Sequence, residues 1–310
     1  MSVEAELAWF SPDKDMLLTI GVFDGVHLGH KYLISQLVAQ ARQQDLLSGV
    51  VTFRQHPQEV LQPQTKLPFL TDLIERNNLL KGEGVAVIIP LTFTAESSQL
   101  GARQFVDLLK KYLRMRGLVI GPDFALGRNR EGNADALCTL GQEMGFTVTV
   151  VPAVMINGGV VSSTAIRKAL ADGDMKKVRS LAGRPFSLHG QVVTGAGRGV
   201  ALGFPTANLD IAPEQAVPAD GVYATWAYID GRTYPAMTNI GRRPTFDSTE
   251  RAAEVYVVDY QSDLYGHELK IDIVERLRDE KKFNTVAELK KQIAEDVKRG
   301  KAILNSESGN

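Results

Sequence analysis

The chain has almost no cysteine and no long apolar run. Cys138 is the only cysteine among 310 residues, so an intrachain disulfide and a cysteine-rich metal site are both excluded. This usage fits a reducing cytoplasm, and we expect Cys138 to be a buried helix residue. No apolar run approaches the roughly 20 residues that span a bilayer, and the start, MSVEAELAWF, is acidic where a secretion signal would be basic. We therefore expect a soluble, cytoplasmic protein.

An excess of charge of either sign is also lacking. Thirty-five basic and thirty-six acidic residues leave a formal net charge of -1, which excludes the global positive field expected of a nucleic-acid coat. Any phosphate binding must therefore be local. The composition, 44% hydrophobic and 23% charged, is ordinary for a globular protein, and this length is more typical of two domains than of one.

The first half of the chain alternates short aliphatic runs with helical patterns. The runs are residues 16–20, 50–53, 85–89, 118–120 and 148–151. Apolar side chains between them recur on single helical faces, namely Leu33, Leu37, Val38 and Ala41, and Phe105, Leu108, Leu109, Tyr112 and Leu113. Such a pattern predicts crossover helices over a parallel sheet, and hence an α/β doubly wound domain.

The pattern changes after Gly183. Alternating or aromatic-rich runs follow, separated in places by turns such as Asp230-Gly231, and they cover residues 191–194, 222–229, 233–237, 254–260 and 268–274. They predict a small antiparallel β-barrel. One closing helix is expected to begin at Thr285 with a capping box to Glu288, and to carry Val286, Leu289, Ile293 and Val297 on one side. We place the domain boundary near Gly183, giving domains of residues 1–182 and 183–310.

A glycine-rich turn with two histidines, GVFDGVHLGH (residues 21–30), runs from a predicted strand into a helix expected near Lys31. The free N–H groups and dipole of a helix start favour phosphate, and this edge of a parallel sheet is where ligands bind. His27 and His30 could donate hydrogen bonds to charge that develops on a transferred phosphoryl group. A metal pair or two incidental histidines remain open, although zinc is disfavoured because it needs about four ligands.

A second segment, GVVSSTAIR (residues 159–167), could likewise bind phosphate at the start of a helix. Ser163 or Thr164 could cap a helix whose first turn offers N–H groups, and Arg167 supplies a planar fork for phosphate oxygens. An ordinary capped surface helix is the alternative.

These motifs carry a family resemblance. The segment GVFDGVHLGH resembles the His-x-Gly-His signature of the nucleotidylyltransferase superfamily, and its Phe-Asp-Gly resembles the flavin-adenylylating branch; SSTAIR resembles a second superfamily element. Residues 50–57 and 121–133 are similar to a strand with a His-Pro turn and to a loop that lines the flavin and nucleotide pocket, with Gln55 and Leu126 as departures. The resemblance implies that His27 and His30 act on the α-phosphate and Arg167 on the departing phosphates. The implied binding residues are Gly21, Phe23, Asp24, Gly25, Asp123, Phe124, Ser163 and Thr164.

The run GAGRGVALGFPTAN (residues 195–208) is the main motif of the second half. It lacks the Gly-Lys-Ser/Thr ending of a Walker loop, so that phosphate cradle is excluded, and its spacing alone allows a flexible barrel loop. The run resembles the riboflavin kinase family, in which the threonine and asparagine help to hold magnesium and nucleotide phosphate; Thr206 and Asn208 match them. The implied binding residues are Gly195, Gly197, Arg198, Gly203 and Pro205.

The strand AEVYVVDY (residues 253–260) resembles the one that bears this family's catalytic glutamate. A carboxylate at Glu254 could accept the proton of the ribityl hydroxyl during in-line phosphoryl transfer. Tyr256 replaces a histidine on the same side of the strand. Residues 218–223, 239–246, 264–266 and 276–283 extend the similarity. An exposed glutamate that only solubilises the barrel is the alternative.

Both resemblances together imply a bifunctional riboflavin kinase/FMN adenylyltransferase of prokaryotic type. Its substrates would be riboflavin, FMN and ATP, with FAD as the product, Mg²⁺ as the cofactor and neither nucleic acid nor membrane as a partner. Two alternatives stay open. One is a riboflavin kinase with a weak or inactive adenylylation domain, and the other is a flavin-binding regulator without turnover.

Overall fold

The computed structural model describes residues 2–195, 197–242 and 251–307. The chain forms two compact units, Met1–Ser163 and Thr164–Asn310. Helices α7 (Ser163–Ala171) and α8 (Met175–Ala182) fall almost wholly in the second unit, whereas a boundary near Gly183 would assign them to the first domain. That boundary stays a prediction. Part of the similar segment 239–246, from Arg243 to Phe246, lies outside the described residues.

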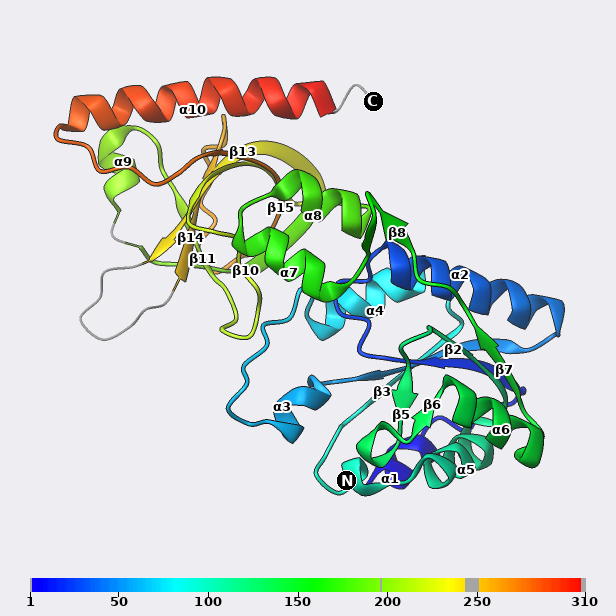
Figure 1. The fold of residues 1–310 in the computed structure, drawn as a ribbon. Coiled ribbons are helices and arrows are strands. Elements are labelled where there is room, and N and C mark those ends of the chain that lie inside the picture. Colours follow the sequence, from blue (N-terminus) through cyan, green and yellow to red (C-terminus); the bar gives the residue numbers. More distant parts are fainter. Residues whose placement is uncertain (1, 196, 243–250, 308–310) are drawn as a thin grey trace. The chain divides into compact units, whose positions relative to one another are not determined.

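The first unit is built on one parallel sheet (Figure 1). Its strands are β1 (Met16–Ile20), β2 (Leu47–Phe53), β3 (Val87–Leu91), β4 (Met115–Ile120) and β7 (Thr147–Val150). They lie in the order β3-β2-β1-β4-β7, and each pair is parallel. The strand order therefore reverses between β1 and β4, and ligands bind beyond the carboxyl ends of such a pair.

Helices cover both faces of this sheet (Figure 1). One face carries α2 (Leu28–Gln43) and α4 (Leu73–Gly82), and the other carries α1 (Val3–Ala8), α5 (Ala102–Leu113) and α6 (Ala134–Met144). Strand β1 supplies both cores because its side chains alternate: Leu17 packs with Ile34 of α2, and Leu18 with Leu109 of α5. The predicted doubly wound domain is confirmed.

Short elements connect these layers. They are α3 (Pro57–Leu61), the 3-10 turns Ser97–Gln99 and Arg128–Arg130, and the strands β5 (Ala125–Leu126), β6 (Gly132–Asn133), β8 (Met155–Ile156) and β9 (Gly159–Val160). The expectation that Cys138 is buried was wrong: it lies on α6 but is exposed. The buried face of α6 is formed by Leu137 and Gly141, and Cys138 is turned about 100° away from Leu137.

The second unit contains a closed barrel in the order β10-β11-β14-β13-β12-β15. Its strands are β10 (Phe186–Val193), β11 (Ala207–Asp210), β12 (Gly221–Ile229), β13 (Arg232–Arg242), β14 (Arg251–Val257) and β15 (Glu268–Arg278). All pairs are antiparallel, which confirms the predicted barrel. Strand β11 was not anticipated, because its four residues begin inside the Pro-Thr-Ala-Asn motif. Helix α9 (Arg198–Leu202) precedes it.

Helix α10 (Val286–Glu307) packs on the outside of the barrel (Figure 1). Half of the predicted capping box is present, since the N–H of Glu288 donates to Thr285 Oγ1 at 3.2 Å. The Glu288 carboxylate accepts the N–H of Asn284, at 3.1 Å, in place of that of Thr285. The apolar side predicted for this helix was wrong at its first residue, because Val286 is 63% exposed. The buried positions are Asp296, Gly300 and Leu304, further along the helix.

One ion pair ties α10 to the barrel and yields a stability prediction. Arg278 Nε donates to both carboxylate oxygens of Asp296, at 3.1 and 2.9 Å, and both side chains are largely buried. We expect Asp296→Ala to lower the free energy of unfolding by about 3 kcal/mol, because a buried arginine would lose its partner. Urea denaturation measures the change.

Two further variants serve as controls. Asp172→Ala removes an exposed pair with Lys168 and should cost under about 1 kcal/mol. An Arg278→Met, Asp296→Leu double variant should recover much of the loss. An Asp296→Ala cost as small as that of Asp172→Ala would contradict the prediction.

Candidate functional site

The histidine turn, defined as residues 21–30, follows β1 at the point where the strand order reverses. Helix α2 begins at Leu28, earlier than expected, and His27 is its N-cap. The Nδ1 atom of His27 accepts the N–H of His30 at 3.2 Å. Because Nδ1 is an acceptor, the proton of neutral His27 lies on Nε2, which is therefore the nitrogen that can donate to a ligand.

The two imidazoles stack on one another. Their ring centroids are 3.6 Å apart with an interplanar angle of 15°. The ring centroid of Phe23 lies 5.1 Å from that of His30, in an edge-to-face arrangement. Burial lowers the pKa of His30 well below its ordinary value, and the charges of His27 and Arg76 lower it further. The Nδ1 of His30 is buried without a hydrogen-bond partner in the described part of the chain. His30 is therefore neutral at pH 7, with an unsatisfied polar atom.

The backbone of the histidine turn is strained. Phe23, Gly25 and Val26 have φ values of 53°, 79° and 35°, and a buried β-branched residue at positive φ is an outlier. At the non-glycine positions Phe23 and Val26, such conformations cost about 1–3 kcal/mol each and persist only where surrounding contacts hold them. A Cβ added at Gly25 would also lie 2.8 Å from Leu70 Cδ1. This position therefore requires glycine for both reasons.

Side chains from four other segments anchor this backbone. Thr52 Oγ1 and Arg76 Nη1 both donate to the carbonyl of Val22, at 3.1 and 2.8 Å. Thr71 Oγ1 accepts the N–H of Gly25 at 3.1 Å, and Ser163 Oγ donates to the carbonyl of Asp24 at 2.9 Å. The turn is thus fixed before any ligand arrives.

Among the predicted binding residues of this turn, Asp24 and Gly21 have local packing roles. The buried carboxylate of Asp24 accepts the N–H of Leu70, at 2.9 and 3.1 Å, and that of Thr71 at 3.2 Å. Gly21 packs against the ring of Phe23. Asp24 therefore shapes the turn by binding the segment that precedes α4.

The predicted phosphate segment lies at the start of α7. This helix begins at Ser163, so Ser163 and Thr164 occupy its first turn instead of capping it. The bond from Ser163 to Asp24 links the beginning of α7 to the histidine turn. Arg167 lies one turn further along α7.

The predicted pocket loop follows β4, the neighbour of β1. Asp123 is exposed, and its carbonyl accepts a hydrogen bond from Arg130 at 2.9 Å. Phe124 is half-buried against the core that α5 covers. Since β1 and β4 are paired, this loop and the histidine turn follow adjacent strand ends and flank the crevice of the sheet.

A second polar cluster lies on the barrel. Asn208 of β11, Glu254 of β14 and Asn239 of β13 are directly opposed across three neighbouring strands, a pairing that places Cβ atoms about 5 Å apart. The carboxylate of Glu254 is thus flanked by two carboxamides. Asn239 Nδ2 also donates to Glu280 Oε1 at 3.4 Å. Tyr256, two residues beyond Glu254, contacts Phe204 edge to face at 5.3 Å.

The glycine-rich run packs closely on this cluster. A Cβ added at Gly195 would overlap the carboxamide of Asn208, which is only 6% exposed. Gly197 and Gly203 flank α9 with φ values of 67° and 80°. Arg198 begins α9, but its side chain lies outside the described parts. The run therefore brings the backbone at Gly195 directly against Asn208.

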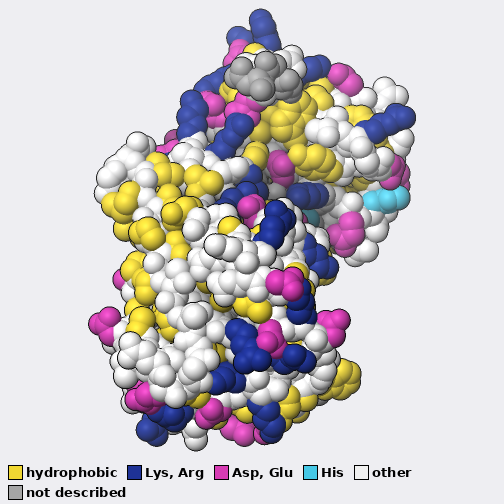
Figure 2. Space-filling view, turned by 90° about the vertical axis from the view of Figure 1, so that its right-hand side faces the viewer, with side chains coloured by type: hydrophobic (Ala, Val, Ile, Leu, Met, Phe, Trp, Pro, Cys, Tyr) yellow, Lys and Arg dark blue, Asp and Glu magenta, His cyan; other side chains and the backbone are white. Residues whose placement is uncertain are grey.

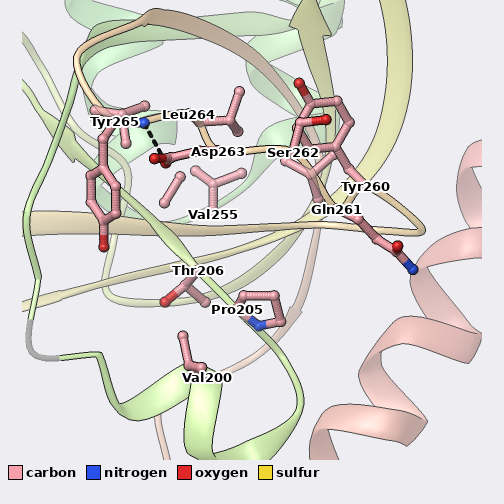
Figure 3. A pocket seen from close by; sticks show the side chains of 13 residues that line it. Val200, Pro205, Thr206, Val255, Tyr260, Gln261, Ser262, Asp263, Leu264 and Tyr265 are labelled. Carbon is pink, nitrogen blue, oxygen red and sulfur yellow. Dashed lines mark hydrogen bonds between the residues drawn. The ribbon is translucent and has the colours of Figure 1, made fainter.

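A cavity of about 270 Å³ opens beside Thr206 (Figure 3). Thr206, Pro205 and Val200 border it on one side, and the loop after β14 borders it on the other. The lining is completed by Val192, Ala207, Val255, Val257, Tyr260, Gln261, Ser262, Asp263, Leu264 and Tyr265. It combines an apolar surface with two aromatic rings and the Thr206 hydroxyl, so it suits a planar ring attached to a polar group.

The donor set near this cavity fits one kind of cation. Thr206 and Asn208 supply neutral oxygens, and in the described ranges no three His, Cys, Asp or Glu residues group as metal ligands. Magnesium commonly takes few protein ligands and completes its shell with water and phosphate oxygens, so these residues fit it. Charges of both signs are interspersed on the face shown in Figure 2. Across the residues that the structure covers, no helix combines the length and apolarity needed to cross a membrane.

Several residues of these sites were not predicted from the sequence. Thr52, Thr71 and Arg76 anchor the histidine turn. Thr52 was noted only as part of the similar segment 50–57, and neither Thr71 nor Arg76 lies in a segment that was singled out. Asn239 was noted only as part of a similar segment. Nothing in the local pattern marks these positions, because their partners are 30 to 54 residues away or on other strands.

Comparisons with known proteins agree for both units. A model described as FAD synthetase matches residues 10–165, and one described as riboflavin kinase matches residues 182–304. A protein of Escherichia coli (strain K12), named "Bifunctional riboflavin kinase/FMN adenylyltransferase", is 37% identical over 288 residues, 92% of each chain. Proteins of the same name from Pseudomonas fluorescens and Bacillus subtilis (strain 168) are 37% and 33% identical and cover 94% and 90% of this chain, and 93% and 90% of their own.

A solved structure covers nearly the same length. It is titled "Crystal Structure of Macrolide-efflux Protein from Streptococcus pneumoniae", with a TM-score of 0.88 and 33% identity over 94% of this chain and 95% of that one. The arrangement of a doubly wound domain followed by a closed barrel is thus shared along almost the whole chain.

Proposed function

Because the chain belongs to the family of bifunctional riboflavin kinase/FMN adenylyltransferases, we propose that it makes FMN and then FAD. In the first step, the terminal ribityl hydroxyl of riboflavin attacks the γ-phosphorus of ATP, and ADP leaves. In the second, a phosphate oxygen of FMN attacks the α-phosphorus of another ATP, and pyrophosphate leaves. The observation that carries this proposal is that both family models match one chain, FAD synthetase at residues 10–165 and riboflavin kinase at residues 182–304.

We assign adenylyl transfer to residues 1–182. His27 Nε2 and His30 would donate hydrogen bonds to the α-phosphate oxygens, where negative charge accumulates during transfer. Arg167 would bind the departing pyrophosphate with its planar fork. The strained, anchored histidine turn supports this assignment, because fixed donors need no reorganisation during the reaction. Gly25, Phe23 and the loop at Asp123 would line the crevice.

We assign riboflavin phosphorylation to residues 183–310. Glu254 would accept the proton of the attacking hydroxyl, and the carboxamides beside it would hold its carboxylate in place. Thr206 and Asn208 would bind the Mg²⁺ that accompanies ATP, which when bound neutralises charge on the phosphate oxygens. The cavity beside Thr206 would take the adenine ring, supported by its apolar and aromatic lining.

A single assay tests the whole proposal. Riboflavin and MgATP are incubated with the full chain, and the flavins are separated by chromatography at successive times. We expect FMN to appear first and FAD to follow. FMN that accumulates without FAD would identify a kinase with an inactive adenylylation domain. If both flavins stayed unchanged while binding tightly, a regulator without turnover would replace this proposal.

Gly195 supplies a prediction specific to the kinase site. Gly195→Ala places a methyl group where the carboxamide of Asn208 lies, so Asn208 must move. We expect FMN formation to fall by about 10- to 100-fold, since displacements near 1 Å can cost that much, while FAD formation from FMN is unchanged. Initial rates of both reactions are measured on one preparation. Gly82→Ala, where an added Cβ meets open space, is the control and should leave both rates intact.

A further inference from the structure

We propose that Arg76 is a positioning residue for adenylyl transfer, with a planar fork that holds the histidine turn and a positive charge that acts on His30. The proposal rests on the assignment of adenylyl transfer to the histidine turn. It concerns a residue of α4, which contributes no motif to either site.

The guanidinium of Arg76 joins the ends of two strands. Its Nη1 donates to the carbonyl of Val22, just after β1, at 2.8 Å, and its Nη2 donates to the carbonyl of Phe53, the last residue of β2, at 2.7 Å. The side chain is 1% exposed and its Cζ lies 5.5 Å from the centroid of Phe69. Only arginine presents two such donors in one rigid plane, so lysine could replace one bond but not both.

The two hydrogen bonds from Arg76 hold the strained part of the histidine turn. Val22 directly precedes Phe23, which has a φ of 53°, and Val26 follows with a φ of 35°. Thr52 holds the same carbonyl of Val22 at 3.1 Å, so loss of Arg76 would loosen the turn without freeing that carbonyl entirely. The carbonyl of Phe53 would lose this donor altogether. We therefore expect misplaced imidazoles in a chain that still folds.

The charge of Arg76 acts on His30 itself. His30 faces the ring of His27, the edge of Phe23 and the field of Arg76. Burial lowers the pKa of Arg76, while Asp24 and Asp72 raise it, and an arginine stays protonated under these conditions. Burial is the largest cause of the lowered pKa of His30, and the field of Arg76 adds to it. An arriving phosphate opposes that field and so favours positive charge on His30.

Two variants separate the fork from the charge. Arg76→Lys keeps a positive charge but cannot make both bonds, and Arg76→Met removes both features. The pKa of His30 is measured by NMR titration of the Cε1–H signals of the five histidines in the full chain without ligand, with His30→Ala to assign the signal. We expect a higher pKa of His30 in Arg76→Met and a value near that of the unmodified chain in Arg76→Lys.

The rates give an independent readout. In both variants, kcat for FAD formation from FMN should fall by about 10- to 100-fold, while riboflavin phosphorylation by the same preparation stays unchanged and shows that the barrel is folded. Arg42→Met, at an exposed arginine of α2, should alter neither the titration nor the rates. If Arg76→Met does not fold, Arg76→Lys still tests the fork, and its titration still tests whether a charge suffices.

Specific results would overturn each part. Full FAD formation by Arg76→Lys would show that the fork is not needed, and an unchanged pKa of His30 in Arg76→Met, or a raised one in Arg76→Lys, would show that the charge of Arg76 does not control His30. If the unmodified chain makes no FAD, the proposed function fails instead, because the NMR titration requires no turnover.

Discussion

His30→Ala is expected to lower FAD formation from FMN by about 10- to 1000-fold, as is typical when one transition-state donor is removed. The imidazole stacks on His27 at 3.6 Å between ring centroids, so its loss removes a donor at the start of α2 and leaves its neighbour unsupported. The loss should fall mainly on kcat, because the interaction is strongest in the transition state. Riboflavin phosphorylation should stay at its original rate.

Initial rates of both reactions, measured on one preparation, test this result. His189→Ala, which changes a histidine of β10 in the barrel, is the control and should leave FAD formation unchanged. Thermal unfolding of His30→Ala shows whether the fold survives. Equal damage to both activities in a folded protein would contradict the division of labour between the two sites.

The sequence predicted the parts of these sites that are local in the chain. Each strand of the parallel sheet is a short aliphatic run, and the histidine turn directly follows the first of them. Such features depend on residues that are close together in the sequence, so the spacing of apolar residues predicts them well. The position of the histidine turn at the carboxyl edge of the sheet follows from the same pattern, whereas the strand order that opens the crevice between β1 and β4 was not predicted.

The parts that sequence reasoning missed depend on distant partners. Arg76 lies on a helix for which the sequence analysis made no prediction, and its two acceptors are 54 and 23 residues away. Strand β11 has four residues and contains an asparagine, so its pattern is too short to indicate a strand. Val286 was assigned to the packed side of α10, but the buried stripe begins later and includes Asp296 because Arg278 pairs with it. In all three cases, contacts between residues that are distant in the sequence determine the structure.

The second large effect concerns the carboxylate on the barrel. Glu254→Gln should lower FMN formation by about 100- to 10,000-fold, the usual contribution of a general base, while FAD formation from added FMN is unaffected. Glutamine has nearly the same shape and keeps its place between Asn208 and Asn239, but its carboxamide cannot accept the hydroxyl proton. Glu254→Ala should be at least as damaging, because it also removes the side chain that these carboxamides flank.

Glu268→Gln, at an exposed position of β15, is the matched control, since it changes one charge on the same barrel and should leave both rates unchanged. If Glu254→Gln phosphorylated riboflavin as fast as this control, Glu254 would be a solubilising residue and another group would have to accept the proton. Glu280 is then the next carboxylate to test, because it already accepts a hydrogen bond from Asn239 at 3.4 Å. A rate that falls in Glu254→Gln and stays intact in Glu280→Gln would assign the base to Glu254 alone.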